Sequence, residues 1–163
     1  MKFIKCFIVL SLYLFIGACV SGYHLNIDIG EYEYHLDEWN SLNMLDYQLR
    51  VGYTENFEQY IVYINVKNGF PESSDPSSWL DEGKKSTIPE FFVYIKEEEE
   101  RIKKAFNGIA TCYMLVYYHP YLHYPWKIIS DDSYNESYPK NRKDWDINLT
   151  PLEGYEQETG NDE

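Results

Sequence analysis

The fold is decided by residues 45–69, which read LDYQLRVGYTENFEQYIVYINVKNG. Two runs of this stretch carry apolar side chains at every second position: Leu45, Tyr47, Leu49, Val51 and Tyr53, and then Tyr60, Val62, Ile64 and Val66. This period places the apolar residues on one face of an extended chain, so each run predicts a half-buried β-strand. The loop at residues 54–59 suits a hairpin, and Asn68-Gly69 predicts a tight turn after the second strand.

A long helix is predicted after a loop at residues 70–85, which is rich in Pro, Ser, Asp and Gly. Thr87-Ile-Pro-Glu90 has the spacing of a capping box, in which the side chain of each end residue bonds the backbone of the other. Apolar residues then recur at helical spacing, at Ile88, Phe91, Phe92, Ile95, Ile102 and Phe106. The run Glu97–Glu100 with its neighbouring lysines predicts a solvated face, and Asn107-Gly108 predicts the helix end. We expect the apolar stripe to pack against the first two strands.

The remaining segments complete an α+β domain. Residues 110–118 and 124–130 are rich in aromatic and β-branched residues and predict two more strands, and residues 31–42 predict a short amphipathic helix. The order ββαββ predicts a four-stranded antiparallel sheet with one main helix packed on one face, preceded by the short N-terminal helix. The single domain is expected to span residues 31–150, followed by an acidic disordered tail at 151–163.

The chain is acidic and rich in tyrosine. Its 163 residues carry a formal charge of -13, and 18% of them are aromatic, mostly tyrosine. Such a surface repels phosphate backbones, so we expect no nucleic-acid partner. Cations or basic proteins would be attracted instead. Tyrosine suits protein surfaces because its ring can be buried while its hydroxyl stays in water.

The N-terminus has the features of an export signal. Two lysines, at positions 2 and 5, precede an apolar run over residues 6–16, which is too short to span a bilayer and suits the core of a signal peptide. Gly17-Ala18-Cys19 follows. Small residues before a cysteine at this place resemble the bacterial lipobox, in which the cysteine becomes the lipidated first residue.

We therefore expect a lipoprotein signal peptide at residues 1–18, lipidation of Cys19 and a tether at residues 19–30. The first expected partner is the membrane, to which the lipid anchor would hold the protein. We expect the protein on the bacterial cell envelope, on its periplasmic or outer surface. The alternative is an ordinary cleaved signal. Cys19 would then be free to form a disulfide with Cys112.

Few residues suggest catalysis or metal binding. His119-Pro-Tyr-Leu-His123 places two imidazoles four residues apart, a spacing that can hold zinc on a helix, but its proline favours a turn between strands. Asp131-Asp132 and the pair Asp144 and Asp146 lack the glycine and terminal glutamate of a calcium loop. The sequence holds no nucleophile elbow, phosphate loop or zinc-hydrolase motif. We therefore expect no catalytic residue, no metal site and no cofactor.

The second face of the predicted sheet is the candidate interaction surface, because one helix covers only one face. Alternation alone leaves the phase of the third strand open, so that strand would present either Tyr113, Leu115 and Tyr117 or Cys112, Met114, Val116 and Tyr118. With Ile61 and Tyr63 from the second strand and Trp126 from the fourth, either set makes an apolar face suited to a protein partner. The residues chosen as the possible interaction surface are Tyr63, Tyr113, Tyr117 and Trp126. The alternative is that the N-terminal helix or residues 145–149 cover this face.

Short motifs follow one another in a set order over residues 36–132: Trp39, Leu45-Asp-Tyr-Gln-Leu49, Val66-Lys-Asn-Gly69, Ser86-Thr-Ile-Pro-Glu-Phe-Phe92, Val116-Tyr-Tyr-His-Pro120, Tyr124-Pro125, Ile128 and Asp131. This order resembles an uncharacterised family of small secreted bacterial domains, often lipoproteins. The chain departs from the family's cysteines after the first strand, and His123 replaces a glycine, so no metal or disulfide role is implied. The family has no assigned activity, and its motifs imply turns, a helix start and core aromatics.

One main hypothesis about function follows: a non-catalytic, lipid-anchored cell-envelope protein that serves as a protein-interaction module of unknown specificity. The alternative is an envelope enzyme or metal-binding protein that uses His119, His123 and nearby carboxylates. A structure in which the two histidine side chains converge with an acidic side chain would favour this alternative. A third hypothesis is an inhibitor domain that blocks a partner with its exposed sheet face.

Overall fold

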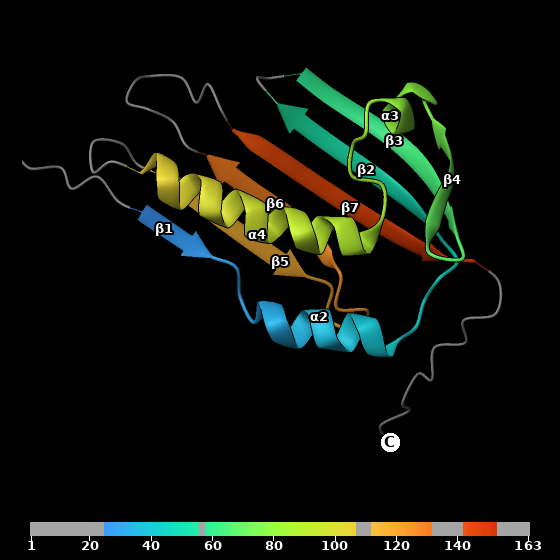
Figure 1. Ribbon diagram of the computed structural model, residues 1–163, viewed down its shortest axis with the longest axis horizontal. Helices are drawn as coiled ribbons and strands as arrows, with labels where there is room; N and C mark the ends of the chain where they lie inside the picture. The colour runs from blue at the N-terminus through green and yellow to red at the C-terminus, as the bar shows by residue number, and fades with distance from the viewer. Residues whose placement is uncertain (1–24, 56–57, 107–111, 132–141, 153–163) are drawn as a thin grey trace, which may run out of the picture.

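One mixed sheet organises the protein, whose computed structural model describes residues 25–55, 58–106, 112–131 and 142–152 (Figure 1). The described elements are β1 (Leu25–Asp28), α2 (Tyr32–Ser41), β2 (Tyr47–Glu55), β3 (Glu58–Lys67), β4 (Phe70–Asp75), α3 (Ser78–Asp81), α4 (Ile88–Ala105), β5 (Cys112–Tyr118), β6 (Pro125–Asp131) and β7 (Lys143–Pro151). The seven strands pair in the order β1-β5-β6-β7-β2-β3-β4, with β1 parallel to β5 and the other pairs antiparallel. The prediction of a four-stranded antiparallel sheet with one main helix is therefore wrong.

The β2–β3 hairpin forms where the alternation predicted it. Leu49 and Val51 of β2 pair with Ile64 and Val62 of β3, and all four side chains are fully buried. The turn that follows β3 has positive φ at Asn68 and at Gly69 (51° and 79°), and it leads directly into β4. The composition of residues 70–75 predicts a loop, because they are largely polar. An edge strand tolerates such residues, since one of its sides pairs with no other strand.

Two further strands come from segments that were expected to lie outside the sheet. β7 pairs with β6 on one side and with β2 on the other, and it buries Trp145 and Ile147. It therefore lies between the β2–β3 hairpin and the β5–β6 pair. β1 comes from the expected tether and pairs with β5, with Leu25 opposite Cys112.

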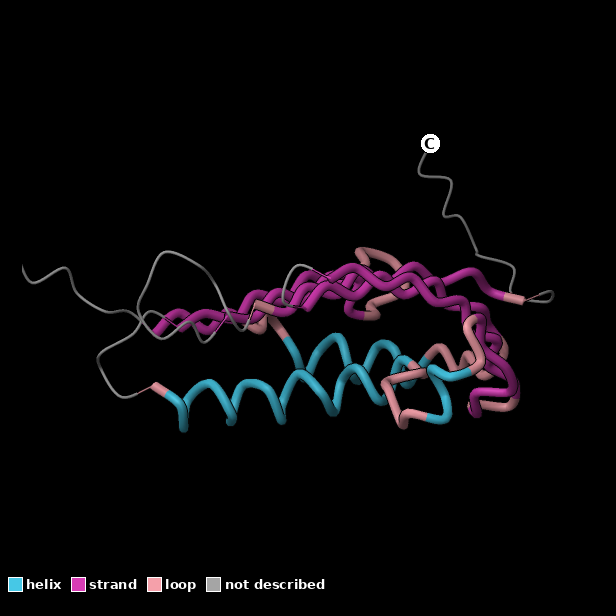
Figure 2. The backbone as a smooth tube through the Cα atoms, turned by 90° about the horizontal axis from the view of Figure 1, so that it is seen from above, coloured by secondary structure: helices cyan, strands magenta, loops and turns pink. Residues whose placement is uncertain are grey.

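All three described helices lie on one face of the sheet, as Figure 2 shows from the side. α4 runs along β5 and β6, and α2 packs beside it, where the Tyr32 hydroxyl donates a 3.0 Å hydrogen bond to the Phe92 carbonyl. Phe91, Phe92 and Ile95 are buried in the core that also holds the inner side chains of β2 and β3. The predicted burial of these three residues is therefore confirmed, but the helix lies mainly on β5 and β6 and not, as expected, on the first two predicted strands.

A capping box and a contact with β2 fix the start of α4. The predicted capping box is present: Glu90 N donates to Thr87 Oγ1 (3.4 Å), and Thr87 N donates to Glu90 Oε2 (3.1 Å). In addition, the backbone N–H of Ile88 donates to the buried hydroxyl of Tyr47 on β2 (3.1 Å). The helix is thus tied to the centre of the sheet at its first turn.

Candidate functional sites

The face of the sheet opposite the described helices exposes one of the two predicted sets on β5. Cys112, Met114 and Val116 are buried beneath the helices, so Tyr113, Leu115 and Tyr117 point to the opposite face. Trp126 joins them from β6, where the register of the strand pair shifts beside Tyr117. The ring centroids of Tyr117 and Trp126 lie 5.9 Å apart, and these side chains are 45% and 39% exposed. We call Tyr113, Leu115, Tyr117 and Trp126 the β5–β6 patch.

The structure does not bring Tyr63 to this patch. Tyr63 is 46% exposed on the same face, but β3 lies four strand positions from β5, a separation of about 19 Å at the usual spacing of strands. Polar residues fill the interval, including Arg50 of β2, which pairs with Tyr63, and Asn148 of β7. Neither expected cover lies on this face, because α2 packs on the helical side and residues 145–149 are a central strand.

The two histidines of the predicted turn have separate environments. His119 stacks on Tyr124, and its Nδ1 accepts the backbone N–H groups of Tyr121 (3.3 Å) and Leu122 (3.1 Å), which is a structural role. His123 instead faces His35 of α2, with the two Nδ1 atoms 3.1 Å apart. Burial and the neighbouring His123 lower the pKa of His35.

Two of the carboxylates near these strands form ion pairs with basic side chains. Asp144 forms an ion pair with Arg142 (3.1 Å), and Asp146 forms one with Lys127 (3.2 Å). Asp132 lies outside the described residues. Within the described part of the chain, no three His, Cys, Asp or Glu side chains group closely enough to hold a metal ion. The convergence that would favour the metal-binding hypothesis is therefore missing there.

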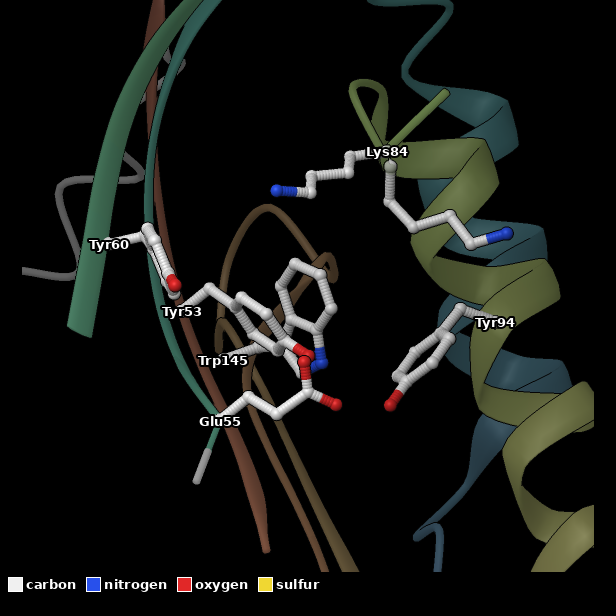
Figure 3. Close-up of a pocket in the computed structure, with 7 residues that line it drawn as sticks. Tyr53, Glu55, Tyr60, Lys84, Tyr94 and Trp145 are labelled. Atoms are coloured by element: carbon white, nitrogen blue, oxygen red, sulfur yellow. The ribbon is translucent and has the colours of Figure 1, made fainter. Parts of the chain in front are cut away.

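A pocket of about 270 Å³ opens on the helical side of the sheet, between α4 and the strands β2, β3 and β7 (Figure 3). Its lining residues are Tyr53 and Glu55 of β2, Tyr60 of β3, Lys84 and Lys85 of the segment before α4, Tyr94 of α4 and Trp145 of β7. The rings of Tyr53 and Trp145 stack with centroids 4.1 Å apart. Sequence analysis missed this site because its residues come from five separate segments.

Two polar atoms at this pocket are buried without a hydrogen-bond partner: the Tyr94 hydroxyl and Trp145 Nε1. In Figure 3 the Tyr94 hydroxyl points from α4 toward the strands that carry Glu55, Tyr53 and Trp145. Burial and the charge of Glu98 raise the pKa of Tyr94. Trp145 and Ser130 lie close enough to oppose that rise, although neither completes a hydrogen bond of good geometry. Burial and the adjacent Glu55 carboxylate raise the pKa of Tyr53.

Glu98 lies behind Tyr94 and is buried, which corrects the expectation that Glu97–Glu100 form a solvated face. Its carboxylate accepts hydrogen bonds from Ser130 Oγ of β6 (2.8 Å) and from the Arg101 guanidinium (2.7 Å). Burial opposes ionisation, but these hydrogen bonds outweigh it and lower the pKa of Glu98. The signal for this burial was present, since Glu98 lies at helical spacing from the apolar stripe.

The two lysines at the pocket are paired with acids. Lys84 Nζ lies 2.6 Å from Glu82 and also sits over the rings of Trp79 (4.8 Å) and Tyr60 (5.4 Å). Lys85 pairs with Glu97 at 3.6 Å. The pocket therefore has aromatic walls, one carboxylate and two ammonium groups whose charges are largely compensated.

Comparisons of the chain with protein-family models, with curated proteins and with solved structures found no match. Among the described residues, no helix is both long enough and apolar enough to cross a membrane. The expected signal peptide and Cys19 lie outside the described residues. The family resemblance and the lipid anchor remain predictions.

Proposed function

We propose that the protein is a non-catalytic, lipid-anchored module of the bacterial cell envelope that binds a protein partner through the β5–β6 patch. The observation that carries the proposal is the exposed pair Tyr117 and Trp126, on a sheet face that none of the described helices covers. Aromatic side chains of this kind are enriched at protein interfaces, where they bury a large area and keep a polar tip. Half-buried Tyr113 and Leu115 beside them make the surface continuous.

The charge of the protein indicates the chemistry of the partner. With a formal charge of -13, the chain attracts a surface with basic residues around an apolar centre. A second copy of the chain would bring the same negative charge and be repelled. The partner of this proposal is therefore a basic protein surface.

The position of the expected anchor indicates where that partner lies. Cys19 precedes the start of β1 at Leu25 by six residues, which span at most about 21 Å when fully extended. A lipid on Cys19 would hold the sheet close to the bilayer, and β5, which carries Tyr113 and Tyr117, is the strand paired with β1. A partner at the membrane surface is thus within reach.

Photocrosslinking from single sites tests this proposal. A benzophenone amino acid replaces Tyr117 in one variant and Tyr63 in the other, in the full chain expressed in cells. Tyr63 is the matched control because it is equally exposed on the same face but lies outside the patch. We expect a discrete crosslink to another protein from position 117 and none from 63, with a yield that falls as ionic strength rises. Equal crosslinking from both positions, none from either, or a crosslink to a second copy would contradict the proposal.

A further inference from the structure

We infer that the pocket between α4 and the strands β2, β3 and β7 binds a neutral, hydroxyl-rich small molecule, such as one sugar unit. The pocket is lined by α4 and lies on the helical side of the sheet, whereas the β5–β6 patch lies on the opposite face. The inference is therefore independent of the proposed protein partner. It rests on the donors and acceptors of the pocket, on their charges and on its size.

The buried donors define one half of the ligand. Tyr94 and Trp145 are only 8% and 5% exposed, and their polar atoms have no partner. An indole N–H can only donate, so Trp145 Nε1 requires an acceptor atom. A ligand oxygen that reached these two groups would satisfy both of them, and leaving such groups unsatisfied in a buried site is costly.

The carboxylate defines the other half. Glu55 lies across the pocket from Tyr94 and beside the Tyr53 hydroxyl. An ionised carboxylate only accepts hydrogen bonds, so the same ligand must also carry a donor. A hydroxyl group both donates and accepts, and a molecule with adjacent hydroxyls can meet Glu55 and Trp145 at once.

The charges around the pocket select against ions. A cationic ligand would compete for the aromatic walls with Lys84, whose ammonium group already lies over the Tyr60 and Trp79 rings. An anionic ligand would meet Glu55, and the acids that pair with both lysines reduce their attraction for it. The overall charge of -13 also repels anions.

The size and walls of the pocket suit a single ring. Its volume of about 270 Å³ lies below the ~300–1,000 Å³ of sites that enclose drug-sized ligands. The stacked rings of Tyr53 and Trp145 give the pocket an apolar wall, and Tyr60 is 42% exposed at the rim. One hydroxylated ring therefore matches the available space.

Titration of the full chain with glucose and with N-acetylglucosamine tests this inference, with tryptophan fluorescence and thermal unfolding as readouts. We expect saturable changes at millimolar concentrations in the wild type. Tyr94→Phe and Trp145→Phe each remove one unpaired donor and should weaken binding about tenfold, the effect of one lost hydrogen bond. Glu55→Gln, at a half-buried position, should weaken it several-fold by removing the charged acceptor.

The variants also separate binding from a general solvent effect, since sugars at high concentration stabilise proteins by being excluded from their surface. Changes that rise without saturation and are equal in wild type and variants would overturn the inference. Tighter binding of glucosamine, glucuronate or alanine than of the two neutral sugars would overturn the assignment to a neutral ligand.

Discussion

Two tyrosines in the core differ in whether their hydroxyl groups have a hydrogen-bond partner, and a pair of matched substitutions can measure this difference. The Tyr47 hydroxyl accepts the Ile88 N–H at the start of α4, whereas the Tyr94 hydroxyl has no partner. Both side chains are buried, with exposed fractions of 1% and 8%. Replacing each by phenylalanine removes the same oxygen atom and keeps the ring, so the two variants differ mainly in the hydrogen bond that is lost.

The expected magnitudes follow from that difference. Ile88 is the first residue of the helix, where the backbone N–H has no partner within the helix. Tyr47→Phe leaves this N–H buried and unpaired, which should lower the free energy of unfolding by about 1–3 kcal/mol. Tyr94→Phe removes a polar atom that is buried without compensation, so its effect on the free protein should lie between zero and about 1 kcal/mol of stabilisation.

Urea unfolding at neutral pH measures both values. The slope against urea concentration should be the same for both variants, because the surface exposed on unfolding does not change. If Tyr94→Phe destabilises the protein as much as Tyr47→Phe, the Tyr94 hydroxyl has a partner. Both the description of the pocket and the inference built on it would then be wrong.

Three further predictions concern the core and the anchor. Glu98→Gln should lower stability at neutral pH by about 1–3 kcal/mol, because it weakens charge-assisted hydrogen bonds to a partly exposed arginine. Its folded pKa is below the ordinary value of 4.5, so this contribution is present above pH 4.5 and is lost as the pH falls through the folded pKa. The free energies of unfolding of wild type and variant, measured at several pH values, should therefore converge in acid. A difference that stays constant with pH would refute the lowered pKa of Glu98. Phe91→Ala should cost about 3–5 kcal/mol because the side chain is fully buried, whereas Val93→Ala, on the exposed side of the same helix, should stay within about 0.5 kcal/mol. Equal melting temperatures for these two variants would contradict the packing of α4. Cys19→Ser should abolish palmitate labelling and release the protein from membranes, and a variant that still partitions into detergent would exclude the lipid anchor.

Local sequence signals located the elements whose patterns were self-contained. The alternation of residues 45–53 and 60–66 predicted the β2–β3 hairpin, because one face of these strands packs on the core and the other meets solvent. Thr87 and Glu90 predicted the start of α4 through a bond pattern that needs only four consecutive residues. In both cases the physical cause lies within the segment itself.

The strands that the sequence did not predict are stabilised by pairing with neighbouring strands. β7 carries the same alternation at Trp145, Ile147 and Leu149, but acids and loop-like surroundings concealed it, and its central position depends on β2 and β6. β4 is polar and short, and it is held by its pairing with β3. These pairings are long-range contacts, so no short window of sequence contains them.

The candidate sites also differ in how far local sequence patterns predict them. Alternation placed Tyr63 on the second face of the sheet but left the phase of β5, and with it the face of Tyr117, open. The distance between the two residues depends on the strand order, in which β7 lies between β6 and β2. The pocket joins Tyr53, Tyr94 and Trp145, whose spacing along the chain forms no motif. Only the folded sheet and helix bring their polar atoms together.

Hydroxyl-radical footprinting most directly tests the claim that a partner covers the β5–β6 patch. The modification of Tyr117, Trp126 and Tyr63 is measured by mass spectrometry in intact cells and again in the purified full chain. In the purified protein all three should react, since each is 39–46% exposed. In cells we predict that Tyr117 and Trp126 are protected several-fold while Tyr63 is not. Equal reactivity of all three residues in cells and in the purified protein would show that the patch is bare and would contradict the proposed function.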